Sequence, residues 1–184
     1  MAMAEGTYTM GPDSGRLLVR TGRTGLGSRA GHDLTIEVTR WRGEVTANRT
    51  DPAQSAVSVD ADVESMEVRE GTGGVKPLTD SDRADIKGNI RKILQTDEHP
   101  EIVFRSTEVS GTPDSFGVTG DLTIRGVTRP VIVRASVDDD GRVLARATVV
   151  QSEWGIKPYS AFFGALKLAD EVAVEVDAKL IPAA

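Results

Sequence analysis

Hydrophobic and polar residues alternate in run after run along this chain, a pattern typical of β-strands with one dry face and one wet face. In residues 57–64, for example, valine and alanine alternate with serine, aspartate and glutamate, and in residues 172–180 three valines oppose Glu175 and Asp177. The pattern predicts strands at residues 16–21, 34–38, 41–47, 57–63, 102–104, 116–124, 131–137, 143–149 and 172–180.

The segments between these runs are short and rich in glycine, proline and aspartate, which is typical of turns between antiparallel neighbours. Residues 111–115, 126–130 and 138–141 are such segments, and Asp140-Gly141 is a strong hairpin signal. Helical patterns do not alternate with the strands, which argues against a parallel sheet of βαβ units. We therefore expect an antiparallel, all-β arrangement.

One helix is predicted in the middle of the chain. Its apolar stripe has the spacing i, i+4, i+7, i+8 and consists of Ile86, Ile90, Ile93 and Leu94. Thr79 or Asp80 can cap its start, and Asp82 and Asp85 suit the positive end of the helix dipole. The helix interrupts the strands once, after a glycine-rich loop at residues 70–77.

An open sheet of this many strands would leave two unpaired edges, so we predict a closed barrel of about eight strands. Residues 1–13 are assigned to an N-terminal tail and residues 14–184 to the barrel domain. The inward side chains are small and aliphatic, and aromatic residues make up only 4% of the chain. Such side chains leave room in the lumen for an apolar ligand. The alternative is a filled core, plugged by the helix with Phe162 and Phe163.

Composition narrows the partners and the compartment. The net charge is −6 and no basic cluster is visible, which argues against nucleic acid and against docking on anionic lipid heads. There are no cysteines and no run of apolar residues long enough to span a membrane. Residues 1–15 lack the pattern of a signal peptide. We expect a cytoplasmic protein without a transmembrane segment.

Catalytic and metal-binding signals are weak, so no enzyme activity, metal or cofactor is predicted. The two histidines, His32 and His99, each stand beside an acidic residue, but neighbours on a strand point to opposite faces. No G-x-S-x-G elbow accompanies them. The G-x-G-x-x-A pattern at residues 25–30 precedes a strand instead of the helix that a dinucleotide site needs. His32 can supply a polar group at a cavity mouth or serve a structural role.

Half of the aromatic residues gather between the last two predicted strands. They are Trp154, Tyr159, Phe162 and Phe163. An apolar cluster of this kind can form the rim of a lipid entrance or a packing plug at a barrel end, and the sequence leaves both open.

Two long segments stand out, HPEIVFRST at residues 99–107 and VTGDLTIRGVTRPV at residues 118–131. They resemble segments of the YceI-like family, the lipocalin-like polyisoprenoid-binding proteins of bacteria. Shorter matches are Gly31–Leu34, Ser65–Val68, Asp82-Arg83 and Trp154–Ile156. The resemblance covers about residues 14–181, and GDLTI-x-GVT-x-PV is its most specific part.

The resemblance implies an antiparallel, eight-stranded lipocalin-like barrel with one α-helix covering one end. It also implies non-enzymatic binding, transport or storage of a polyisoprenoid or isoprenoid quinone in the lumen, and frequent homodimers. The predicted ligand-binding residues are Val59, Ala61, Phe104, Phe116, Leu122, Val133 and Ala147 in the lining, Trp154, Phe162 and Phe163 at the rim, and His32 at the mouth. The alternatives are a filled barrel acting as a protein-interaction or stress-response module, and an enzyme acting on a lipid near His32.

Overall fold

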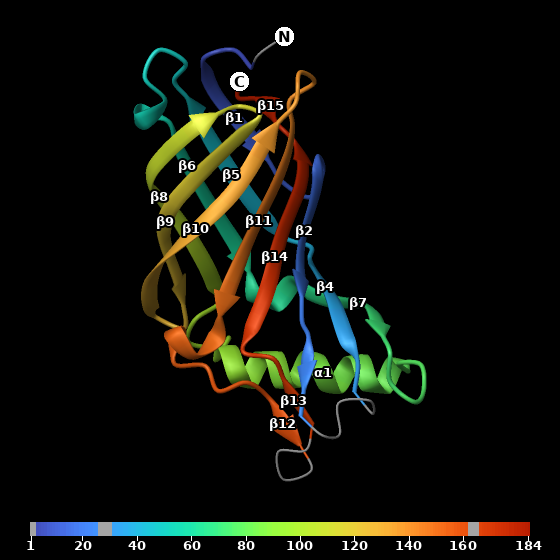
Figure 1. Cartoon of the computed structure of the whole chain (residues 1–184). Helices are drawn as coiled ribbons and strands as arrows, with labels where there is room; N and C mark the ends of the chain where they lie inside the picture. Colours follow the sequence, from blue (N-terminus) through green and yellow to red (C-terminus); the bar gives the residue numbers. More distant parts are fainter. Residues whose placement is uncertain (1–2, 26–30, 162–165) are drawn as a thin grey trace.

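The structure is a computed structural model that describes residues 3–25, 31–161 and 166–184 (Figure 1). Within these residues, a large antiparallel sheet of twelve strands curls around an interior, and one α-helix and a small three-stranded sheet lie at its lower end. The predicted all-β class with antiparallel pairing and one helix is confirmed.

The large sheet has the order β15-β1-β5-β6-β8-β9-β10-β11-β14-β2-β4-β7. Its strands are β1 (Gly6–Met10), β2 (Gly15–Arg20), β4 (Asp33–Val38), β5 (Trp41–Ala47), β6 (Ala56–Asp62), β7 (Met66–Thr72), β8 (Glu101–Thr112), β9 (Ser115–Ile124), β10 (Val127–Val137), β11 (Arg142–Val150), β14 (Glu171–Lys179) and β15 (Ile181–Pro182). The small sheet contains β3 (Arg23–Thr24), β12 (Ser160–Ala161) and β13 (Leu166–Leu168). The helix is α1 (Asp80–Leu94), and the 3-10 turns are η2 (Pro52–Gln54), η3 (Val63–Ser65) and η4 (Gln151–Trp154).

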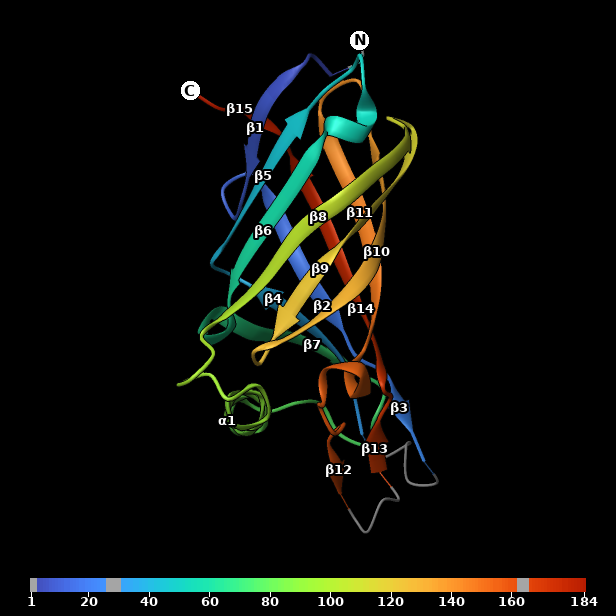
Figure 2. The ribbon, with the colours of Figure 1, turned by 90° about the vertical axis from the view of Figure 1, so that its left-hand side faces the viewer.

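The predicted count of eight strands is not confirmed, because several long runs are interrupted by bends. A turn at residues 11–14 separates β1 from β2, residues 39–40 separate β4 from β5, and η3 separates β6 from β7. Each pair continues in one direction: β1 and β2 pair with β5 and β4, while β15 and β14 pair with β1 and β2. The last strands thus bond to the first, and the sheet curls round on itself (Figure 2).

Residues 6–10, which are expected from the sequence to belong to an N-terminal tail, form β1 and pair with residues 43–47 of β5. The hydrophobic alternation in this segment is too short to stand out, since only Tyr8 and Met10 are large and apolar. The hairpin predicted at Asp140-Gly141 is present, with Gly141 at a φ of 80°. The Asp138 carboxylate accepts the backbone N–H groups of Asp140 and Arg142 in this turn.

Helix α1 begins where the sequence predicts. The Thr79 hydroxyl accepts the Asp82 N–H, and the Asp82 carboxylate accepts the Thr79 N–H, which makes a complete capping box. The hydrogen bond that the Thr79 backbone N–H donates to the Asp82 carboxylate is the main reason that the pKa of this carboxyl lies below its usual 3.8. Gln95 ends the helix in the left-handed conformation.

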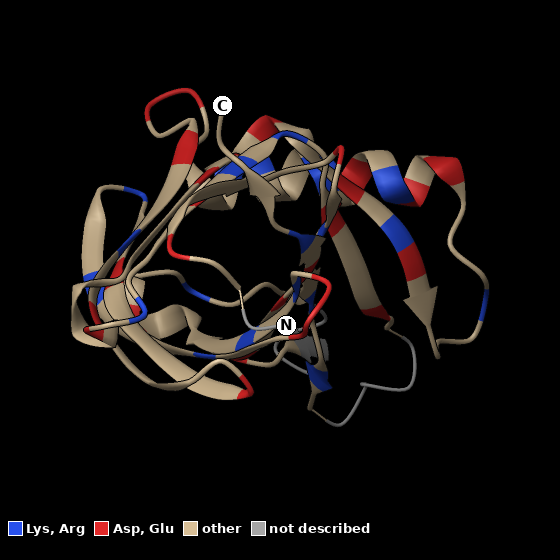
Figure 3. Cartoon of the chain, turned by 90° about the horizontal axis from the view of Figure 1, so that it is seen from above, with Lys and Arg blue, Asp and Glu red and all other residues tan. Residues whose placement is uncertain are grey.

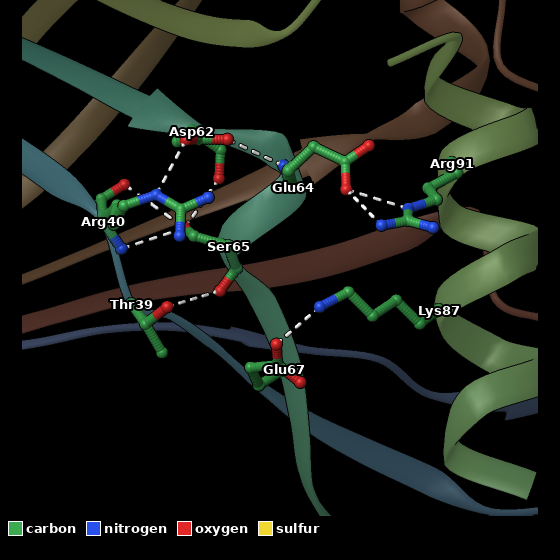
Figure 4. Close-up of polar contacts among 8 residues, drawn as sticks. All are labelled: Thr39, Arg40, Asp62, Glu64, Ser65, Glu67, Lys87 and Arg91. Carbon is green, nitrogen blue, oxygen red and sulfur yellow. Dashed lines mark hydrogen bonds and ion pairs between the residues drawn. The ribbon is translucent and has the colours of Figure 1, made fainter. Parts of the chain in front are cut away.

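Two ion pairs hold α1 against the corner where β6 passes into β7 (Figure 4). Lys87 Nζ lies 2.5 Å from the Glu67 carboxylate, and Arg91 Nη2 lies 2.6 Å from that of Glu64. The corner itself is fixed by Ser65, which is 1% exposed and whose hydroxyl accepts the Arg40 N–H at 2.9 Å. None of the residues of α1 is buried. The helix therefore sits on a rigid corner but lies outside the packed core.

Among the described residues, no helix is both long enough and apolar enough to cross a membrane.

Candidate functional site: the cavity inside the sheet

The curled sheet encloses a cavity of about 980 Å³. Seen from above, the strands surround the interior, and α1 runs along one side of the lower end (Figure 3). The walls come from the inward faces of the sheet, and α1 adds Ile86, Ile90 and Ile93. The helix thus borders the lower end instead of crossing its middle, and it shares that end with the small sheet (Figure 2).

Every residue predicted to line the lumen does line this cavity. The set is Val59, Ala61, Phe104, Phe116, Leu122, Val133 and Ala147. Ala61 and Phe104 are buried, while the others keep part of their surface accessible although they point inward. Inward apolar side chains with accessible surface mean that the lumen is not filled by protein at these positions, which argues against the filled-core alternative.

The apolar stripe of α1 forms part of the cavity wall, whereas the sequence left open whether the helix plugs the core. Ile86, Ile90, Ile93 and Leu94 all line it, as does Leu78 just before the helix. The helical periodicity identified the stripe, but it could not distinguish a helix that fills the lumen from one that lines it. Met10 and Met66 also line the cavity and were missed, because neither lies in a long alternating run.

His32 lies at the lower mouth, where it both lines the cavity and holds a loop. Its Nε2 is 2.6 Å from the Lys76 carbonyl oxygen, which can only accept, so Nε2 carries a proton and donates. The loop passes so close that a Cβ at Gly74 would lie 2.6 Å from Nε2, and Gly74 has a φ of 73°. The glycine is therefore required by both space and conformation.

Most other polar side chains at this end have partners within the protein. Thr21 accepts the Leu34 N–H, and Gln151 donates to the Ala169 carbonyl. Asp85 and Asn89 differ: they stand one helical turn apart on α1, both line the cavity, and neither side chain has a hydrogen bond or ion pair to the residues that the structure describes. They give the α1 end of the cavity a polar surface with unused hydrogen-bonding capacity.

The predicted aromatic rim is placed differently. Trp154 is 1% exposed, does not line the cavity, and donates from Nε1 to the Leu122 carbonyl at 2.8 Å. It is a packing plug in the wall. Tyr159 is exposed and lines the lower mouth. Phe162 and Phe163 lie outside the described residues, as do residues 26–30 of the G-x-G-x-x-A pattern.

In the part of the chain that the structure describes, no group of three or more acidic, histidine or cysteine side chains is arranged to hold a metal ion. His32 and His99 are also far apart in the fold, because His32 borders β4 whereas His99 packs near Gly126 in the β9–β10 turn. The arrangement is that of an apolar container with polar groups at its mouths.

Comparisons with known proteins agree with this architecture. The chain is 31% identical to the UPF0312 protein of Photorhabdus laumondii over 102 residues, covering 54% of this chain and 46% of that protein. It is 34% identical to the UPF0312 protein of Azotobacter vinelandii over 101 residues, covering 53% of each. The matches thus span about half the length of these curated relatives.

Solved structures share the fold at low sequence identity. BcnA of Burkholderia cenocepacia superposes with a TM-score of 0.63 at 16% identity, over 91% of this chain and 96% of that one. The YCEI protein of Campylobacter jejuni superposes with a TM-score of 0.58 at 10% identity, over 81% and 84% of the two chains. The model of the YceI-like domain matches residues 18–180. The chain therefore belongs to the YceI-like family.

Proposed function

We propose that this protein binds a long apolar molecule of the polyisoprenoid or isoprenoid quinone type, without catalysis, for transport or storage. The observation that carries the proposal is the apolar cavity of about 980 Å³ inside the curled sheet. This volume is at the upper end of the range typical of ligand pockets. The cavity is long enough for an elongated molecule, since its lining reaches from Asn48 and Pro113 at one end to α1 at the other.

The energetics of such binding are favourable. Burial gains about 0.8 kcal/mol for each CH₂-sized group, so a few five-carbon units provide enough free energy for tight association. The interior walls are mostly valine, leucine, isoleucine and alanine, which offer no polar group that a hydrocarbon tail would leave unsatisfied.

The polar end of the ligand is expected to lie beneath α1. Asp85 and Asn89 are available there, and a carboxylate accepts hydrogen bonds but repels an anion. An uncharged hydroxyl fits these groups better than a diphosphate does. A tail with an alcohol end is therefore expected to bind more tightly than the same tail with a diphosphate end.

The experiment compares binding of a fluorescent prenyl probe by two matched variants. Ala145→Phe adds a ring inside the cavity, whereas Leu144→Phe adds one on the outer face of the same strand. The inner ring displaces about two CH₂-sized groups of ligand, so we expect affinity to fall about tenfold for Ala145→Phe and to stay unchanged for Leu144→Phe. Equal affinity in both variants would contradict binding in the lumen.

The oligomeric state and the compartment stay predictions. A homodimer is expected from the family resemblance, and light scattering on the purified protein tests it. A cytoplasmic location is expected from the sequence, and fractionation of the source cells tests it.

A further inference from the structure

The wall of the curled sheet is split between β10 and β11. The two strands pair only at their upper ends, from Arg134↔Arg146 to Val137↔Val143. Below this point each strand keeps its other neighbour, since β10 pairs with β9 over residues 127–135 and β11 pairs with β14 over its full length. Figure 1 shows β10 curving away from β11 here. Pro130, which has no N–H to donate, lies in this stretch of β10, as expected for a strand with an open edge.

Only one layer of side chains closes the split. Val131 and Ala147 line both the interior cavity and a hollow of about 580 Å³ on the outer surface. Trp154 of η4 packs in one cluster with Val131 and Val149, and it also borders the outer hollow. Arg129 Nε, on β10, donates to the Glu153 carbonyl at 3.2 Å and ties η4 in place. At this point only these side chains separate the interior cavity from the hollow on the outer surface.

The outer face around the split carries exposed aliphatic side chains. Ile132 on β10 is 59% exposed and Leu144 on β11 is 48% exposed. Both point away from the cavity, because the neighbouring residues of the opposite parity, Val131, Val133 and Val143, line it. Ile132 lies two residues below Arg134 on β10, and Leu144 lies two residues above Arg146 on β11, so the two aliphatic side chains flank this arginine pair on the outer face.

Two arginines stand directly opposite each other on the same face. Arg134 and Arg146 are partners in the pairing register, and like charges at opposed positions destabilise a sheet. Arg134 has no ion pair to the described residues, and the carboxylate of Glu175 lies 3.8 Å from Arg146 but only 2.9 Å from Arg20. The repulsion between the two guanidinium groups is thus left largely uncompensated within the chain, and an external anion would relieve it.

We propose that this surface, formed by Ile132, Arg134, Leu144 and Arg146 around the split, docks on an anionic lipid bilayer. A bilayer supplies phosphates for the arginines and an apolar interior for the aliphatic side chains. It is also where a long apolar ligand resides, so this inference rests on the proposed function. The sequence shows no basic cluster because the two arginines are separated along the chain and come together only across strands.

The test measures co-sedimentation with vesicles of phosphatidylcholine, either pure or mixed with phosphatidylglycerol. We expect binding to the mixed vesicles only, weakening as salt is raised. Each arginine near an anionic surface contributes about a fivefold gain in affinity, so Arg134→Gln/Arg146→Gln should lower binding more than tenfold. Ile132→Ser/Leu144→Ser should lower it as well.

The matched control is Arg16→Gln/Arg42→Gln. It removes the same charge from side chains that are as exposed as Arg146 but lie elsewhere on the sheet. Equal losses in the two arginine doubles, or equal binding to both vesicle types, would overturn the proposal. Polyglutamate serves as a second probe. The proposal would also be overturned if polyglutamate bound as tightly as the vesicles, lost its binding in the arginine double and kept it in the serine double, because the partner would then be an acidic protein. Thermal unfolding of each variant reports whether it is folded.

Uptake of a short, water-soluble prenyl probe separates this proposal from the proposed function. Arg134→Gln is the variant for this comparison, because Arg134 borders only the outer hollow whereas Arg146 also lines the interior cavity. It should take up the probe as the wild type does. If the wild type takes up no probe, ligand binding fails, while vesicle binding still reports on the docking surface alone.

Discussion

The wall of the container and the helix at its lower end are held in different ways. The wall buries apolar side chains on a hydrogen-bonded sheet, and Val38, Val118 and Ala178 are at most 3% exposed. Helix α1 has no buried residue and is held by its capping box, its half-buried stripe and two ion pairs. Packing is worth several kcal/mol per residue, whereas ion pairs near the surface are worth much less. The wall is therefore expected to open only in global unfolding, and α1 in local opening.

The largest effect is expected at the plug in the wall. Trp154→Ala removes a fully buried indole and its hydrogen bond to Leu122, and should lower the free energy of unfolding by about 3–5 kcal/mol. Denaturant unfolding measures this loss. Trp154→Phe serves as the control, because it keeps most of the apolar volume and should lose less. A loss below about 1 kcal/mol in the alanine variant would show that η4 does not seal the wall.

The next effect concerns the start of the helix. Thr79→Ala removes the side-chain acceptor of the capping box and should destabilise α1 by about 1 kcal/mol. Amide hydrogen exchange should quicken in α1 and stay unchanged in β9 and β14. Thr79→Ser, which keeps the hydroxyl, is the matched control. Equal acceleration in the sheet would contradict the distinction between the two regions.

A smaller effect is expected from the ion pairs on the corner. Arg91→Gln breaks the bonds to Glu64, and a pair this exposed is worth about 0.2–1 kcal/mol. Exchange in α1 should accelerate slightly, and added salt should erase the difference from wild type. Arg69→Gln breaks a comparably exposed pair with Glu37 on the sheet and should leave exchange in α1 unchanged. A difference that survives high salt would mean that Arg91 acts through packing.

The smallest effect is a dependence of α1 on pH. The Thr79 backbone N–H holds the pKa of Asp82 below its usual 3.8 in the folded protein. This carboxylate therefore stabilises the helix above pH 3.8, and the stabilisation is lost as the pH falls through the lower folded-state pKa. Helix exchange measured in acid should show this loss in wild type and not in Asp82→Asn. The same profile in both proteins would assign the acid sensitivity to other carboxylates.

The features that depend on residues close together in the sequence were predicted from the pattern of hydrophobic and polar residues. The period-two alternation identified which side chains point inward, so the lining residues from Val59 to Ala147 were named correctly as a surface. The stripe and cap of α1 followed from the spacing of its isoleucines and from Thr79.

Features that depend on how distant strands meet were not predictable from one sequence. Alternation continues through Val131, Val133, Ala147 and Val149, so nothing in the pattern signals that β10 and β11 part at this level. The opposition of Arg134 and Arg146 arises only from the register of that pairing. Bends such as η3 likewise divide a run into two strands while its hydrophobic residues continue on both sides of the bend. The large sheet therefore has twelve strands where the sequence pattern predicts about eight.

Native mass spectrometry of the gently purified protein, followed by organic extraction, tests the central claim most directly. If the cavity holds a long apolar molecule, the protein should carry an added mass that organic solvent releases as a lipid. Ala145→Phe should carry less of it than Leu144→Phe. A protein that shows only its own mass, and that also takes up no fluorescent prenyl probe, would contradict the account.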